Sequence, residues 1–150
     1  MDLTPLTAIS PIDGRYHAKT APLQDIFSEA ALIRHRVIVE IAWLKTLSEE
    51  TSLTEIPKFS KDAHKFINEL IDNFKIDAAN NVKEIESKTN HDVKSVEYYL
   101  RDQFQTHPEL SKISRFIPFG CTSEDINNTA YSLMTKGAVE NIIDIVWYFS

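Results

Sequence analysis

Residues 89–104 read TNHDVKSVEYYLRDQF and contain both a helix and the polar turn that starts it. The apolar residues of this stretch recur every three or four positions, which is the period of one buried helix face. They are Val93, Val96, Leu100 and Phe104. Because Asn or Asp just before such a run caps the free N–H groups of the first turn, we expect Asn90 or Asp92 to cap this helix. The stretch predicts a helix from Asp92 to about residue 105.

The turn before this helix also carries groups suited to chemistry. Asn90, His91 and Asp92 place an amide, an imidazole and a carboxylate on consecutive residues. Side chains at a helix start lie at the positive end of the helix dipole, where an anion is stabilised. Two interpretations stay open from these residues alone: a cap with a histidine packed beside it, or an anion-binding turn.

Helical patterns continue on both sides of the stretch. Upstream, a long helix is expected from Pro22 to about residue 44, with apolar residues on two flanks, so it should be covered on more than one side. Ser60 is expected to cap a second helix, and a shorter one begins near Asp77. Residues 110–116 suggest a brief helical turn, and the last helix begins at about Ser123. No alternating strand pattern and no internal repeat occurs, so the predicted fold class is all-α.

Composition narrows the classes of function. The chain has 150 residues, 43% of them apolar and 25% charged, as in soluble globular domains. A net charge of −6 argues against nucleic-acid binding, and no apolar run is long enough to cross a membrane. A single cysteine and no secretory signal suggest a cytoplasmic protein. The five histidines are scattered, so we predict no metal site.

The last helix keeps its apolar period up to the final residues, VWYFS, without Gly, Pro or a basic last turn. Large exposed apolar faces mark partner surfaces. The sequence therefore indicates either a truncated chain, which we favour, or an obligate helix-bundle oligomer.

Two other stretches carry candidate binding groups. In SPIDGRY (10–16), Pro11 and the Asp13-Gly14 pair fix a tight turn that aims Arg15 and Tyr16. The arginine fork suits phosphate or carboxylate, although a surface salt bridge would also explain it.

In GCTSEDINN (120–128), Thr122 to Asp125 matches a capping box, which explains the stretch without any function. The same geometry exposes the hydroxyls of Thr122 and Ser123 to a carboxylate or phosphate. With the Asn90–Asp92 turn and SPIDGRY, the chain has three anion-friendly turns, a combination that suits a small polyanionic metabolite held between helices.

The order and spacing of SPIDGRY, TNHDVKSVEYYL and FGCTSEDINN resemble the bacterial type of the adenylosuccinate lyase family, in the fumarase/aspartase superfamily. The resemblance extends over essentially the whole chain. It implies a β-elimination that releases fumarate from adenylosuccinate, giving AMP, and from the succinylated carboxamide ribotide of purine synthesis. It implies no cofactor, a homotetramer built around a long helix bundle, and active sites shared between subunits.

Carried over by position, the resemblance implies substrate-binding roles for seven residues. Arg15 and Tyr16 match a nucleotide-contacting pair near the phosphate. Asn90, His91 and Asp92 match a substrate-binding turn, in which His91 bonds an anionic group or helps to order the catalytic acid. Thr122 and Ser123 match hydroxyls that hold a carboxylate of the succinyl group.

The chain departs from the family pattern in two ways. Pro118 stands where the family often has a histidine, so a contact made there is lost or replaced. The family's catalytic acid and base are expected beyond residue 150, so we expect no catalytic residue within this chain and no activity from it alone.

We expect an irregular lead-in over 1–21, an N-terminal helical domain over 22–119, and the truncated first part of a bundle helix over 120–150. By itself the chain is expected to dimerise, or to form a swapped arrangement, through residues 123–149. The alternative is an autonomous helical interaction or oligomerisation module without catalytic activity.

Overall fold

The computed structural model describes the backbone of residue 2 and residues 4–149, and the side chains of this part up to Glu140. All regular secondary structure in this part is helical, so the prediction of an all-α fold is confirmed. No helix in the described part combines the length and the apolar character that a membrane span requires.

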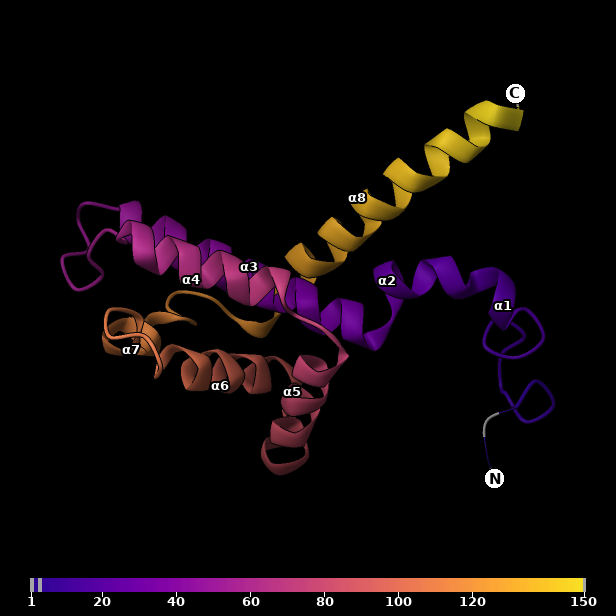
Figure 1. Ribbon diagram of the computed structural model, residues 1–150, viewed down its shortest axis with the longest axis horizontal. Coiled ribbons are helices and arrows are strands. Elements are labelled where there is room, and N and C mark those ends of the chain that lie inside the picture. The colour runs from indigo at the N-terminus through magenta and orange to yellow at the C-terminus, as the bar shows by residue number, and fades with distance from the viewer. Residues whose placement is uncertain (1, 3, 150) are drawn as a thin grey trace.

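The first helical segments are short and lie at one end of the molecule (Figure 1). They are α1 (His17–Thr20), the 3-10 turn η1 (Ala21–Leu23) and α2 (Gln24–Phe27). Helical backbone thus begins before Pro22, where the sequence predicts the first helix. The predicted long helix is also interrupted, because Ser28 is extended and its side chain accepts a hydrogen bond from the N–H of Ala31. This N-cap starts a new helix, α3 (Glu29–Glu49).

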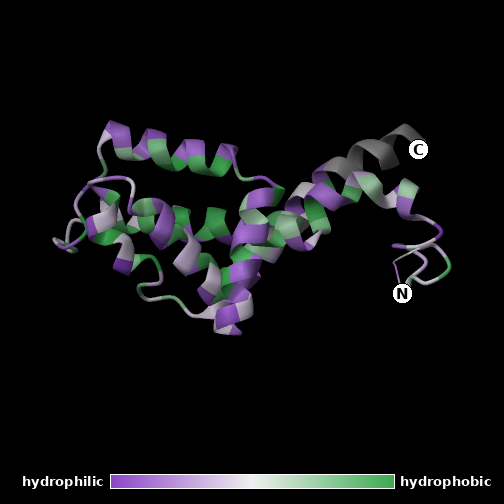
Figure 2. Ribbon diagram, turned by 60° about the horizontal axis from the view of Figure 1, so that its bottom comes forward, coloured by the Kyte–Doolittle hydropathy of each residue, from purple (hydrophilic) through white to green (hydrophobic). Residues whose placement is uncertain are grey.

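Five more α-helices follow α3 in the described part of the chain. α4 (Lys61–Asp72) begins at the predicted cap, where the Ser60 side chain accepts from the N–H of Ala63. Figure 2 shows its polar residues on the outer side and its apolar residues toward the other helices. α5 (Ile76–Thr89) and α6 (Asp92–Phe104) follow, and α7 (Leu110–Ile113) with the 3-10 turn η2 (Ser114–Phe116) forms the predicted brief turn. α8 (Ser123–Phe149) then runs away from the body (Figure 1).

α3 separates two hydrophobic clusters, as its two apolar flanks predict. The larger cluster joins α3 to α4, α5, α6 and α7, and contains the fully buried Leu44, Leu100 and Phe104. The smaller cluster joins α3 and α6 to the first half of α8. Its buried members are Leu32, Val39, Val93, Ile126, Ala130 and Met134. α3 therefore lies between the two clusters and fixes the start of α6 and the start of α8 relative to each other.

Candidate functional site

The turn between α5 and α6 is built by two residues with different roles. Asn90 adopts the left-handed conformation (φ 52°), which asparagine tolerates, and its N–H bonds the carbonyl of Glu86 to end α5. His91 is the N-cap of α6, because its Nδ1 accepts a hydrogen bond from the N–H of Lys94 at 3.2 Å. The expectation that Asn90 or Asp92 caps the helix is wrong: Asn90 ends the preceding helix, and Asp92 is the first residue of α6.

The cap sets the tautomer and the direction of the His91 ring. Since Nδ1 accepts a hydrogen bond in this arrangement, the neutral imidazole carries its proton on Nε2, which can then donate to an anion. The side chain is half exposed. Behind it the turn is braced, as the buried Ser95 hydroxyl donates to the His91 carbonyl at 2.5 Å and lies 2.8 Å from the Thr89 hydroxyl.

Asp92 is held by a buried arginine. The Nη2 of Arg36, a residue of α3 that is 4% exposed, donates to Asp92 Oδ2 at 2.6 Å. Partial burial by itself raises the pKa of Asp92, but the N–H of Val93 and the Arg36 guanidinium outweigh it and hold the pKa below its usual range. Asp92 is therefore a fixed carboxylate that orients the turn.

The start of α8 carries the third candidate stretch. The N–H and the hydroxyl of Thr122 both donate to Asp125 Oδ2, at 2.6 and 2.8 Å. This is the carboxylate half of the predicted capping box. The Thr122 hydroxyl must therefore leave Asp125 before it can donate to a ligand, whereas the Ser123 hydroxyl makes no side-chain hydrogen bond within the described part of the chain.

The structure links the second and third stretches through Arg36. Its Nε donates to Asn127 Oδ1 in the first turns of α8 at 2.9 Å, while its Nη2 holds Asp92. Sequence reasoning missed this residue. A signal was present, because Arg36 and Glu40 are four residues apart, and so lie on one side of a helix that is apolar on both flanks.

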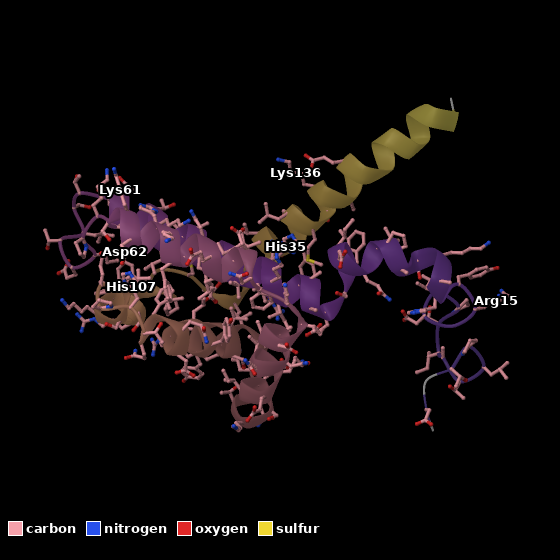
Figure 3. The ribbon with its side chains drawn as sticks, in the orientation of Figure 1. Arg15, His35, Lys61, Asp62, His107 and Lys136 are labelled. Carbon is pink, nitrogen blue, oxygen red and sulfur yellow. The ribbon has the colours of Figure 1, made fainter. Side chains whose placement is uncertain are left out.

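The first stretch lies apart from the other two. Figure 3 shows Arg15 on the lead-in, beyond α2 and away from the body. Its guanidinium lies over the ring of Tyr16, 4.8 Å from the centroid. No hydrogen bond or ion pair among the described residues joins Arg15 or Tyr16 to the turns at α6 and α8. The expected convergence of all three stretches is thus not made within the described chain.

Two clefts lie near these residues. An open cleft of about 730 Å³ is lined by Asn90, His91 and Asp92 together with three residues of α5, Lys83, Glu86 and Ser87. A larger, mostly apolar cleft of about 900 Å³ runs between the lead-in, the start of α3 and the connection from α4 to α5. None of the seven predicted binding residues lines the larger cleft. Three of them, Asn90, His91 and Asp92, line the smaller cleft, which is therefore the candidate site, whereas Arg15, Tyr16, Thr122 and Ser123 line neither.

A buried group of charges lies behind this site, where α3 faces α6. Glu97 contacts Lys94 and Arg101, each at 2.6 Å, and Glu40 is 2% exposed with its Oε2 unpaired. Burial and the charge of Glu97 raise the pKa of Glu40 to about 8, against the opposing charges of Lys94, Arg36 and Arg101. Glu40 therefore keeps its proton at neutral pH.

The loop that leads to α8 is anchored on α3. The indole N–H of Trp43 donates to the carbonyl of Phe119 at 2.7 Å, and Gly120 takes a positive φ of 75°. Pro118 stands at the start of this turn and its carbonyl accepts from the N–H of Cys121. Burial, Asp125 and Glu40 raise the pKa of the Cys121 thiol, which fits the expected packing role rather than that of a nucleophile.

The arrangement offers hydrogen-bond donors to an anion. His91 Nε2, the Asn90 amide and the Ser123 hydroxyl are donors at or next to two helix starts, where negative charge is stabilised. In the described residues, no group of three or more His, Cys, Asp or Glu side chains is arranged to hold a metal ion.

Comparison with known proteins gives one family match and several close relatives. The model of a family described as Lyase matches residues 14–150. The chain is 49% identical over 143 residues to a protein of Vibrio cholerae named adenylosuccinate lyase, covering 95% of this chain and 31% of that protein. It is 51% identical to the protein of that name from Legionella pneumophila (strain Corby), with the same coverage.

The protein of the same name from Escherichia coli (strain K12) is 45% identical over 147 residues, which are 98% of this chain and 32% of that protein. The chain thus spans about a third of the length of the curated relatives it matches. Because the family model covers all but the first 13 residues, the chain belongs to the lyase family.

Proposed function

We propose that this chain is the N-terminal part of an enzyme that eliminates fumarate from adenylosuccinate, giving AMP, and from the succinylated carboxamide ribotide. One observation carries the proposal. The two turns that match the family pattern most specifically, Asn90–Asp92 and Thr122–Ser123, lie at helix starts tied to each other by Arg36. The names of the relatives, at 45 to 51% identity, support the choice of substrate.

In this proposal the chain supplies contacts to the negative groups of the substrate. His91 Nε2 donates to an anionic group or orders the catalytic acid, while Asn90 and Asp92 shape the turn around it. Ser123, and Thr122 once released from Asp125, hold a succinyl carboxylate. As the proton beside that carboxylate is removed, negative charge builds up on its oxygens, and such donors then bind more strongly.

Arg15 and Tyr16 act near the phosphate, and this role fits a site shared between subunits. Arg15 lies beyond α2 and away from the body (Figure 3), and neither Arg15 nor Tyr16 lines the cleft formed by the Asn90–Asp92 turn and α5. A homo-oligomer, a tetramer for the full-length protein, would supply them from a second copy. The exposed Tyr131, Leu133 and Val139 of α8 support assembly with further helices.

The test is release of fumarate from adenylosuccinate by the full-length protein, with argininosuccinate as the competing substrate. We expect turnover of adenylosuccinate only, and none from the 150-residue chain alone. His91→Ala should lower kcat/KM by on the order of 100-fold or more. His64→Ala, a half-buried histidine of α4 outside the cleft, serves as the control. Near-normal turnover by His91→Ala would remove His91 from the site.

The second candidate is a helical interaction module without catalysis. The observation in its favour is α8, which runs away from the body in Figure 1 and exposes Tyr131, Leu133 and Val139. Sedimentation equilibrium of the 150-residue chain tests it: a well-folded, strictly monomeric chain counts against the module.

A further inference from the structure

Arg36 has an unusual position for a charged residue, because it is buried on α3, the helix that lies between the two hydrophobic clusters. It is 4% exposed and reaches two different helices. Its Nη2 contacts Asp92, the first residue of α6, and its Nε contacts Asn127, one turn into α8. Asp92 adjoins His91, and Asn127 follows Ser123 by one helical turn.

The chemistry of the guanidinium makes this link rigid. The group is planar, and its N–H donors point in fixed directions. Two acceptors bound on one such plane cannot move independently of each other. The 2.6 and 2.9 Å contacts therefore fix not only the length of each link but also the angle between them.

Because Arg36 is buried, breaking either of its two hydrogen bonds destabilises the folded chain. A buried charge is tolerated only when it is paired and hydrogen-bonded, so a movement of either helix start would leave the guanidinium with an unsatisfied donor. Glu40, one turn further along α3, is protonated at neutral pH, so it has no negative charge with which to replace Asp92 as the partner of Arg36. Asp92 and Asn127 are thus the two side chains that accept hydrogen bonds from Arg36 in the described part of the chain.

We propose that Arg36 is a positioning residue that holds the Asn90–Asp92 turn and the Thr122–Ser123 turn at a fixed separation, so that donors on both can contact one anionic substrate. The inference rests on the proposed function and adds a residue to it that touches no substrate. It assigns the relative placement of two binding turns to a single side chain.

The kinetic test compares variants of the full-length protein. Arg36→Met keeps much of the volume but removes both links, and Asn127→Ala removes only the link to α8. Arg101→Met is the matched control, because Arg101 also pairs with a buried carboxylate, Glu97, but contacts neither turn. A misplacement of about 1 Å costs on the order of 100-fold in rate, so we expect a loss of that size in kcat/KM for Arg36→Met.

The form of the loss separates positioning from instability. A smaller folded fraction lowers apparent kcat and leaves KM unchanged, whereas displaced binding turns raise KM. We expect KM to rise in Arg36→Met and, less strongly, in Asn127→Ala, but not in Arg101→Met. Arg36→Lys should recover only part of the loss, because an ammonium group lacks the planar fork. An unchanged KM in Arg36→Met, or an equal rise in Arg101→Met, overturns the proposal.

A second measurement does not depend on turnover. Amide hydrogen exchange of the ligand-free full-length protein should become faster in the first turns of both α6 and α8 in Arg36→Met, and in neither with Arg101→Met. Unchanged exchange in either turn of Arg36→Met overturns the link itself. If the wild-type protein releases no fumarate, the proposed function fails, while this comparison still decides whether Arg36 holds the two turns together.

Discussion

Replacing Glu40 by glutamine tests the buried charges directly, because glutamine keeps the shape of the side chain and cannot ionise. Glu40 lies in α3 against α6, where it faces Glu97, Lys94 and Arg101, and its pKa rises from 4.5 to about 8. Below pH 4.5 the carboxyl group is protonated in both the folded and the unfolded chain. Between pH 4.5 and about 8, only the folded chain keeps the proton.

The sign of the effect follows from this difference in bound protons. The unfolded state binds fewer protons in this window, so the free energy of unfolding falls as the pH rises, by about 1.4 kcal/mol per pH unit. From pH 5 to pH 8 the loss amounts to at most about 4 kcal/mol. Glu40→Gln removes this slope, and its stability relative to wild type should therefore grow steadily over that range.

The assay is urea denaturation followed by circular dichroism at pH 5, 6, 7 and 8. Glu69→Gln, an exposed glutamate of α4, is the control and should follow the wild type at every pH. Parallel stability curves for Glu40→Gln and wild type between pH 5 and 8 would refute the reasoning, since they would mean that Glu40 loses its proton at its ordinary pKa in the folded chain.

Three further changes test local features. Ser60→Ala removes the N-cap of α4 and should cost about 1 kcal/mol in urea denaturation, while Ser60→Asp should restore it. Phe104→Ala leaves a cavity at a fully buried position of the larger cluster and should lower the free energy of unfolding by about 3–5 kcal/mol. An unchanged midpoint of urea denaturation would contradict this prediction. Gly14→Ala places a Cβ 3.1 Å from both Ala8 Cβ and the Pro5 carbonyl, so hydrogen exchange of the lead-in should become faster.

The start of a helix could be predicted from the sequence where a capping residue directly precedes an apolar helical period. Ser60 before α4 and the capping-box pair before α8 were predicted at the right residues, because each depends on neighbours within one turn. Ser28 was missed for the opposite reason. The apolar period continues through it, and only the local backbone shows that its side chain starts a new helix.

Several features of the candidate site depend on the packing of the helices and could not be predicted from the sequence. His91 was expected beside a cap and is the cap, because imidazole nitrogen can replace the usual oxygen acceptor. The placement of two binding turns on one arginine requires the packing of α3 against both α6 and α8, which no spacing along the chain reveals. The separation of Arg15 from these turns is likewise a result of the path that α1 and α2 take. The proposed domain boundaries and substrate contacts stay predictions.

The unequal size of the two clusters on α3 has a consequence for motion. The larger cluster joins five helices, whereas the smaller cluster, which joins α8 to α3 and α6, has six buried members among the side chains that the structure describes. Local unfolding starts where few apolar contacts must be broken. We therefore expect the start of α8 to open more often than the main core, with loss of the hydrogen bond between Arg36 and Asn127. The position of the Ser123 hydroxyl would then depend less on the stability of the whole chain than on how often this one helix opens.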